Sequence, residues 1–506
     1  MKLIIKTHRT DLISDDRGLL HAIDDKFAIA FPNYWYTNSY KNGTWDGKKH
    51  FFSLLRGSMP TGLLGLLLEF LRSREVSFEL RDMRTPLLEV EPILKLGRFD
   101  LISPDYDYQA DAVRKSLTAG CGVLSIATNG GKTIIAASII KSLGLPALFV
   151  VNGKDLLFQT YDVFNDVLED VAMYGAGSHS HGTVTVAMAQ SLVKLAKKTP
   201  SMLKRYEIIF SDECHRLPSD TLETIFNRCP ARYRFGLSGT ALDENPVRNY
   251  RLMAVTGPII SEIRNKELIE RGVSAKPTVY FSLSKGDKLV AGTKYSTAVN
   301  LGIVYNEERN LQIVELVKKL QKEGKNTILV LSPRKMHGLE LFNLMQYESM
   351  DVTFNHGSTP DFIRKTTLQE FKTEGGIMLA SIIFDEGVDI PKMDALILAG
   401  GGKKFRRLLQ RVGRALRKKE DENIVVVYDF YDWQHKNLAA HSANRLKAHL
   451  GEGFEVVPLE GTEAWVEAIK DELENPKPKV RRKPAPFVTK NRNRIAIRLK
   501  QLRKEK

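Results

Sequence analysis

Three kinds of residue in this sequence have types and spacing suited to phosphoryl transfer: a lysine after glycines, a pair of carboxylates and a pair of arginines. Lys132 follows two glycines and precedes Thr133, a pattern in which the lysine reaches the β- and γ-phosphates of a nucleotide and the hydroxyl holds Mg2+. Asp212 and Glu213 are adjacent, and neighbouring carboxylates repel each other unless they share a cation. We therefore expect Asp212 to bind Mg2+ and Glu213 to polarise the attacking water.

The lysine belongs to a glycine turn, residues 127–133, that lies between a strand-like run at 122–126 and a helix-like run at 134–141. Strand, glycine turn and helix in that order bind anions, because the amides freed by the glycines and by the helix N-terminus point at the ligand. An ordinary strand-turn-helix connection is the alternative, because the first glycine of the full pattern is replaced by Ile126. The residues predicted to contact phosphate are Asn129, Gly130, Gly131, Lys132 and Thr133.

Two further features could complete a nucleotide site. Gln109 precedes the glycine turn and could pair with adenine through its amide. Arg414 and Arg417 are three residues apart on a predicted helix, so they share one face and could present two guanidinium groups to a γ-phosphate from outside the first domain. The alternative is a basic, solvated helix face, and for Asp212 and Glu213 it is an acidic strand end without function.

Buried strands and amphipathic helices alternate through most of the chain. A continuous apolar run, typical of a parallel strand covered on both faces, occurs at residues 147–151, and further strand-like runs rich in apolar residues occur at 184–187, 206–210, 326–331 and 377–380. This alternation predicts an α/β fold with two doubly wound parallel sheets, whose ligands bind at the carboxyl ends of the strands. The predicted domains are 1–95 (small α+β), 96–275 and 276–455 (α/β), and 456–506 (basic extension).

Aromatic and basic residues interleave between residues 33 and 50 of the N-terminal segment. Aromatic faces stack on bases and lysines meet phosphates, so Trp45 and Lys48 are candidates for nucleic-acid contact. The alternative, equally well supported, is that these rings form the core and turn of the small domain itself.

The net charge of +15 predicts a polyanionic partner, and most of it is local. Residues 476–506 hold thirteen Lys or Arg and one acid, a net +12, which leaves +3 for the other residues. Such a tail attracts DNA phosphates without regard to sequence. A solvated appendage is the alternative.

Three cysteines without CxxC spacing support neither a disulfide framework nor a zinc site, and a reducing cytoplasm fits. The longest apolar stretch near the N-terminus ends at Glu69 and is too short to span a bilayer, so we expect no membrane role.

The stretches Gly-Gly-Lys-Thr, Asp-Glu-Cys-His and Ser-Gly-Thr-Ala, in that order, resemble motifs I, II and III of the superfamily 2 helicases. The resemblance implies two RecA-like domains that close over ATP and Mg2+, with Gln109 as the glutamine of the Q motif. It also implies further contacts, to the nucleotide from the later half of the chain and to the nucleic-acid backbone from both halves. For the nucleotide these are Gly387, Asp389 on the ribose, Gln410, and arginine fingers at Arg414 and Arg417. For the nucleic-acid backbone they are Asn152, Gln190, His356 and Ser381.

The run Tyr40 to Gly47, with its Trp-Asp-Gly, and the overall layout are similar to the UvsW-type phage recombination helicases. This similarity implies branched or forked DNA as substrate, with branch migration, fork regression or unwinding as the activity. It also implies phage recombination proteins as partners in a host cytoplasm; a monomer is favoured. Two rival hypotheses stay open: an RNA-remodelling ATPase, and an annealing protein whose ATPase is vestigial.

Overall fold

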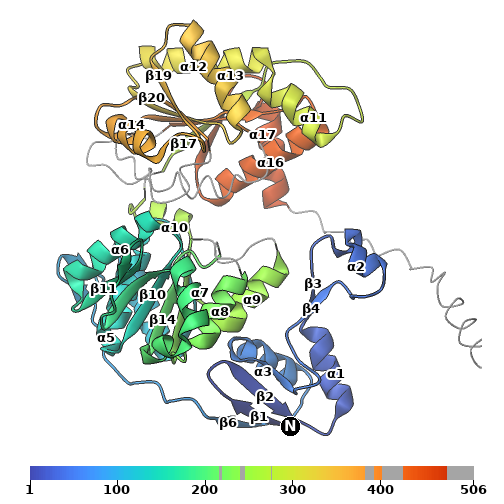
Figure 1. Ribbon diagram of the computed structural model, residues 1–506. Helices are drawn as coiled ribbons and strands as arrows, with labels where there is room; N and C mark the ends of the chain where they lie inside the picture. Colours follow the sequence, from blue (N-terminus) through green and yellow to red (C-terminus); the bar gives the residue numbers. More distant parts are fainter. Residues whose placement is uncertain (216–218, 240–244, 275, 382–392, 402–425, 476–506) are drawn as a thin grey trace, which may run out of the picture. The chain divides into compact units, whose positions relative to one another are not determined.

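The computed structural model describes residues 1–215, 219–239, 245–274, 276–381, 393–401 and 426–475 (Figure 1). Several residues predicted to act on the nucleotide, and the basic tail at 476–506, lie outside the described residues. These are Gly387, Asp389, Gln410, Arg414 and Arg417. The described chain divides into two units, Met1–Thr462 and a unit that begins at Glu463.

The N-terminal part is a small mixed sheet covered by helices, as the sequence predicts. Its four strands have the order β5-β2-β1-β6. β1 pairs antiparallel with β2 and parallel with β6. The elements are β1 (Lys2–Ile5), β2 (Arg9–Ile13), β5 (Ser58–Pro60), β6 (Glu79–Asp82), α1 (Arg17–Lys26) and α3 (Leu64–Ser73). A second pair, β3 (Ala28–Ala30) and β4 (Lys48–His50), flanks α2 (Asn38–Lys41).

The first large sheet has eight strands in the order β12-β11-β13-β10-β14-β15-β9-β16, and all but β12 are parallel. The strands are β9 (Cys121–Ile126), β10 (Ala147–Val151), β11 (Val171–Gly175), β12 (Ser178–His179), β13 (Val184–Met188), β14 (Ile208–Ser211), β15 (Tyr233–Ser238) and β16 (Ile259–Ile263). The helices are α4 (Asp107–Ala119), α5 (Lys132–Leu143), α6 (Lys154–Val167), α7 (Ala189–Lys198), α8 (Ser219–Arg228), α9 (Pro246–Thr256) and α10 (Asn265–Glu270).

The second large sheet has seven parallel strands in the order β19-β20-β18-β21-β22-β17-β23. The strands are β17 (Thr278–Leu283), β18 (Thr327–Leu331), β19 (Val352–Asn355), β20 (Gly376–Ala380), β21 (Ala395–Leu398), β22 (Val426–Tyr431) and β23 (Glu455–Pro458). The helices are α11 (Tyr295–Val299), α12 (Glu307–Lys322), α13 (Lys335–Tyr347), α14 (Asp361–Thr373) and α16 (Lys436–Gly451). The sheet therefore extends across the predicted boundary at residue 455, and α17 (Glu463–Glu474) follows it in the chain.

Apolar side chains explain why both large sheets form. Every residue of β10 and of β18 is buried, because helices on both faces of a parallel sheet leave no strand face in water. Phe149, Phe210 and Phe235 stack across three neighbouring strands of the first sheet, with ring centroids 5.8 and 5.0 Å apart. The prediction of an α/β fold with two parallel sheets is confirmed.

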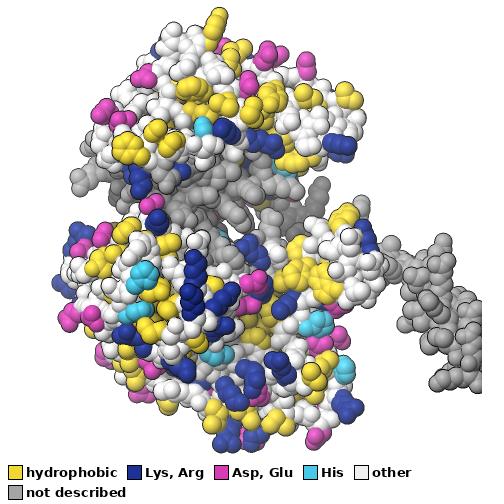
Figure 2. Space-filling view, in the orientation of Figure 1, with side chains coloured by type: hydrophobic (Ala, Val, Ile, Leu, Met, Phe, Trp, Pro, Cys, Tyr) yellow, Lys and Arg dark blue, Asp and Glu magenta, His cyan; other side chains and the backbone are white. Residues whose placement is uncertain are grey.

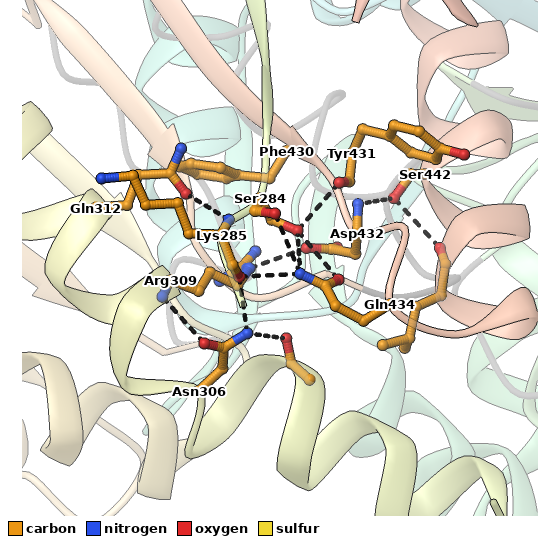
Figure 3. A network of polar contacts seen from close by, with 12 residues as sticks. Ser284, Lys285, Asn306, Arg309, Gln312, Phe430, Tyr431, Asp432, Gln434 and Ser442 are labelled. Carbon is orange, nitrogen blue, oxygen red and sulfur yellow. Dashed lines mark hydrogen bonds and ion pairs between the residues drawn. The ribbon is translucent and has the colours of Figure 1, made fainter. Parts of the chain in front are cut away.

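Buried charges hold the end of β22 in the second sheet to two helices. Arg309 of α12 donates to Asp432 at 2.9 Å, and Arg445 of α16 donates to Asp429 at 2.9 Å and to Asp432 at 3.2 Å. Each of these four residues is at most 2% exposed. Polar side chains around Asp432 complete the network (Figure 3). They are Ser284 directly after β17, Asn306 directly before α12, Gln434 between β22 and α16, and Ser442 in α16.

Within the described residues, no helix is long and apolar enough to cross a membrane. All three cysteines are free thiols. Burial raises the pKa of Cys214 and Cys229, so both thiols stay protonated inside the first domain.

Candidate nucleotide and nucleic-acid site

The carboxyl edge of the first sheet gathers the residues predicted to act on the nucleotide. The glycine turn follows β9, Asp212 follows β14, and Ser238 ends β15. Because these strands are parallel, their carboxyl ends meet at one edge of the sheet. Three stretches that are far apart in the sequence therefore lie together.

The backbone of the glycine turn is suited to an anion. Asn129 and Gly131 have positive φ angles of 71° and 80°, and the chain passes directly from Gly131 into α5 at Lys132. A Cβ at Gly131 would collide with the amide of Gln109, so the turn requires glycine there. The first amides of α5 have no partner within the helix and are available to a phosphate.

Lys132 is held loosely beside the carboxylates. Its Nζ lies 3.7 Å from Oε1 of Glu213 and donates to the carbonyl of Ile126 at 3.3 Å. The Lys132 and Glu213 side chains are 10% and 8% exposed. The ion-pair distance exceeds the 2.7–2.9 Å of a strong charge-assisted hydrogen bond, so a phosphate could draw the lysine away at little cost.

Asp212 and Thr133 supply the oxygen atoms that Mg2+ prefers. The amide of Asp212 donates to Val150 of the neighbouring β10 at 2.8 Å, and its Oδ1 accepts from the amide of Glu213 at 2.9 Å. Thr133 is the second residue of α5 and is half-buried. A carboxylate and a hydroxyl next to a phosphate site fit a cation that binds through one or two protein oxygens and keeps several waters.

His215 joins the carboxylates to the end of β15. Its Nδ1 lies 2.7 Å from Oγ of Ser238 and 3.4 Å from Oε2 of Glu213. A Cβ at Gly239, the next residue, would lie 3.6 Å from Nζ of Lys132. The hydrogen bond thus brings together two stretches, Asp-Glu-Cys-His and Ser-Gly-Thr, that are 23 positions apart in the sequence.

Gln109 contacts the phosphate loop. Its Nε2 donates to the carbonyl of Gly130 and to the hydroxyl of Tyr108, both at 3.3 Å, and the residue is 6% exposed. Burial raises the pKa of Tyr108 to about 12, so this phenol stays neutral. The predicted pairing of Gln109 with adenine stays a prediction.

Asn152 and Gln190 lie on neighbouring strand ends of the first sheet. Asn152 directly follows β10, and Gln190 is the second residue of α7, directly after β13. β10 and β13 pair in parallel, so both residues are brought to the carboxyl edge.

His356 and Ser381 are brought together at the carboxyl edge of the second sheet. They follow the paired strands β19 and β20, and the amide of Ser381 donates to Asn355 at 3.0 Å. Nζ of Lys335, the first residue of α13, reaches Ser358 of the same loop at 3.3 Å. Burial and the Lys335 charge lower the pKa of His356. Lys335 is not among the residues predicted from the sequence, although a basic residue that begins the helix after a buried strand is a usable signal.

Trp45 and Lys48 contact each other where a turn leads into β4. The indole Nε1 of Trp45 donates to the carbonyl of Lys48 at 2.9 Å, and its ring packs edge-on against Phe31 at 5.4 Å. Lys48 is exposed. In the part of the chain that the structure describes, no hydrogen bond or ion pair links either residue to the first large sheet. Trp45 thus stabilises its own turn, and nucleic-acid contact by the pair stays a prediction.

Comparisons with known proteins agree with this geometry. Residues 103–243 match the family "Type III restriction enzyme, res subunit", and residues 309–419 match "Helicase conserved C-terminal domain". The chain is 26% identical over 405 residues to the DNA 3'-5' translocase XPB2 of Sulfurisphaera tokodaii, covering 69% of this chain and 89% of that protein. It is 25% identical over 509 residues to the ATP-dependent DNA helicase uvsW of Enterobacteria phage T4, covering 90% and 98%.

A solved structure has the same fold. The HsdR subunit fragment of a type I restriction enzyme from Vibrio vulnificus aligns with a TM-score of 0.51 at 20% identity, covering 66% of this chain and 65% of the fragment. At that identity the likeness concerns the fold alone.

Proposed function

The chain belongs to superfamily 2 of the helicases, and from that premise we propose that it uses ATP hydrolysis to move along DNA and to remodel branched DNA. It is an ATP-dependent DNA helicase or translocase. The observation that carries the proposal is the cluster of Lys132, Glu213, His215 and Ser238 at one carboxyl edge, because a phosphate-binding lysine, a base and a relay are linked there by two ion pairs and a hydrogen bond.

Each member of the cluster has a distinct part in hydrolysis. Lys132 leaves Glu213 for the β- and γ-phosphates when ATP enters, and Glu213 then orients the attacking water. Thr133 and Asp212 would hold Mg2+, which neutralises charge on the phosphates when bound. His215 contacts both Glu213 and Ser238, so a change in the position or charge of Glu213 during hydrolysis would be transmitted to Ser238 at the end of β15.

The remaining predicted contacts belong to the same proposal. Gln109, Asn129, Gly130 and Gly131 would bind the nucleotide on the first domain, and Gly387, Asp389, Gln410, Arg414 and Arg417 would complete that site. DNA would be gripped by Asn152 and Gln190 on the first sheet, by His356 and Ser381 on the second, and by Trp45 and Lys48 of the N-terminal part. The basic residues of 476–506 would add phosphate contacts that do not depend on sequence.

Branched DNA is the proposed substrate for two reasons. The chain covers nearly the whole of the T4 helicase, with no large part of that protein left unmatched. It also carries the Trp-Asp-Gly stretch before β4, in an accessory domain separate in sequence from the two large sheets.

The test compares a Holliday junction, a fork, a linear duplex and a matched RNA fork, each with and without ATP. We expect ATP-dependent processing of the junction and the DNA fork, and none with Lys132→Ala. Lys115→Ala, which removes an exposed lysine paired with Asp111 on α4, should keep full activity and serves as the control. Faster processing of the RNA fork would instead support an RNA-remodelling ATPase, and junction annealing without ATP hydrolysis would support a vestigial motor.

A further inference from the structure

The exposed face of α7 carries three lysines in line with a predicted DNA contact. Gln190, Lys194 and Lys198 follow one another at intervals of four, and Lys197 lies three residues after Lys194, spacings that place residues on one side of a helix. All four are exposed, whereas Ala189, Leu192 and Ala196 on the other side are buried. In Figure 2, dark-blue side chains gather over the part of the first domain where Figure 1 labels α7. We call these four residues the α7 stripe.

The lysines of the stripe differ from those of α12 in their charged partners. No ion pair among the described residues involves Lys194, Lys197 or Lys198. On α12, by contrast, Lys318 and Lys319 pair with Glu348 and Glu323. The guanidinium of Arg228, from α8, donates to the carbonyl of Ala196 and adds positive charge beside the last turn of α7.

The stripe leads away from the carboxyl edge of the sheet. α7 starts directly after β13, at the edge where the nucleotide residues lie, and runs back to where β14 begins. With a rise of about 1.5 Å per residue, Gln190 and Lys198 are about 12 Å apart along the helix axis. The lysines therefore extend a predicted backbone contact into a track.

We propose that the α7 stripe binds the phosphate backbone of a duplex DNA arm that leaves the motor, an inference that rests on the proposed function. Lys194 and Lys198 are about 6 Å apart along the axis, and one DNA strand carries a charge about every 3.4 Å, so different lysines meet different phosphates. Single strands are bound by aromatic stacking as well as by charge, and α7 contains no aromatic residue, which favours a duplex. Continuity with Gln190 favours DNA over an acidic protein.

The test measures how salt weakens binding to two DNAs. Both carry the same short single-stranded loading region, and only one continues into a duplex arm of about 20 base pairs. The variant Lys194→Gln/Lys197→Gln/Lys198→Gln removes the three charges and keeps residues that favour a helix. Its matched control is Lys318→Gln/Lys319→Gln/Lys322→Gln on α12.

For the arm-bearing DNA, each lost phosphate contact lowers the salt slope by about 0.9, so the variant should lose about 2.7 of the slope. Between 50 and 200 mM salt the wild type should then lose about 40-fold more affinity than the variant. Binding to the armless DNA, and the ATPase activity that it stimulates, should be unchanged in both variants.

Three results would overturn the inference. They are an unchanged slope with the arm, an equal loss on both DNAs, and an equal loss in the α12 control. Impaired binding of a poly-glutamate peptide with a normal slope on the arm would reassign the stripe to an acidic protein. A wild-type chain without ATPase activity on the armless DNA would instead refute the proposed function, so the two failures are distinguishable.

Discussion

The charged clusters at the carboxyl edges of the two large sheets differ in burial and in the length of their ion pairs. At the first sheet, the side chains of Lys132, Glu213 and His215 are 8% to 10% exposed, and the ion pairs between them are 3.4 to 3.7 Å long. At the second sheet, Arg445 and Asp429 are at most 2% exposed and are joined at 2.9 Å. Both clusters lie where parallel strands end, so position in the fold alone does not distinguish a reactive cluster from a structural one.

The difference indicates which cluster can change partners. A loosely held lysine can exchange its carboxylate partner for a phosphate, because a long ion pair contributes little interaction energy. A dry, tightly bonded pair cannot, because removing one member leaves an uncompensated charge in the interior. In the second network, burial alone would raise the pKa of Asp429, but Arg445 and His449 beside it keep that pKa below its usual value. The second network therefore fixes strand ends, whereas the first is poised for ligands.

The largest expected effect is on hydrolysis at the loose cluster. Glu213→Gln removes the group that polarises water, so DNA-stimulated ATPase activity should fall about 1,000-fold, a typical contribution for a general base. The thermal midpoint should change little, because glutamine keeps nearly the size and shape of glutamate. Glu223→Gln, which alters a carboxylate paired with Arg251 in the same domain, is the control and should stay active. An active Glu213→Gln enzyme would remove the distinction between the two clusters.

The next effect is on stability at the tight cluster. Arg445→Met leaves Asp429 and Asp432 without their shared cation, which should cost about 3–5 kcal/mol. Hydrogen exchange of the β22 and α16 amides measures this loss within the second sheet. Arg264→Met, which breaks an exposed pair with Glu262, should cost less than about 1 kcal/mol. Equal losses in the two variants would show that burial does not separate the clusters.

The sequence predicts the first cluster because its signals are local. One run of apolar residues precedes a glycine turn and another precedes adjacent carboxylates, so each run determines a strand together with the loop at its carboxyl end. Parallel pairing then brings the strand ends together without further information. This explains why the α/β fold and the neighbourhood of Lys132 and Glu213 are predictable.

The second cluster has no such signal. Arg309 and Asp432 are 123 positions apart, and their partnership depends on how α12 packs beside β22. In the sequence, Arg309 and Arg445 look like ordinary solvated helix charges. The contact of Gln109 is likewise not readable from the sequence, because only the folded turn shows that its amide donates to the carbonyl of Gly130. Tertiary packing decides which polar residues become buried, and spacing along the chain does not record it.

A smaller effect concerns how the stability of the second domain depends on pH. His337 of α13 is fully buried beside Arg309, and burial, together with the charges of Arg309 and Arg334, lowers its pKa to about 3. The unfolded chain takes up this proton near pH 6.5, so folded-state stability falls as pH drops from 6.5 toward 3. Between pH 6.5 and pH 5 the loss should be about 2 kcal/mol. Hydrogen exchange of α12 and α13 at both pH values measures it.

His337→Gln isolates this contribution, because glutamine does not titrate and can still donate to Oδ1 of Asn310, which lies 2.9 Å from Nε2 of His337. The variant should lose about 2 kcal/mol less on acidification than the wild type. An identical pH dependence in the two proteins would show that His337 takes up its proton in the folded protein as readily as in the unfolded chain. That result would contradict the burial of this histidine inside the second domain.

The smallest expected effect tests whether the cluster of Lys132, Glu213 and His215 transmits a signal between bound DNA and ATP hydrolysis. Ser238→Ala removes the 2.7 Å hydrogen bond to His215 but leaves Lys132, Asp212 and Glu213 in place. A hydrogen bond of this kind contributes about 0.5–1.5 kcal/mol, so DNA stimulation of the ATPase should fall up to about 10-fold while basal hydrolysis stays within about 2-fold. Ser125→Ala is the control, because Ser125 pairs with Ser238 in register on β9.

Stimulated and basal rates measured side by side for the two serine variants decide the outcome. If Ser238→Ala lowers only the DNA-stimulated rate, His215 transmits the effect of bound DNA to the ATPase site. An equal loss of both rates would assign the Ser238 bond to hydrolysis itself, because a group that only relays has no reason to slow the DNA-free reaction. The cluster of Lys132, Glu213 and His215 would then act in hydrolysis without transmitting a signal from DNA. It would differ from the cluster of the second sheet only in that its lysine can exchange a carboxylate for a phosphate.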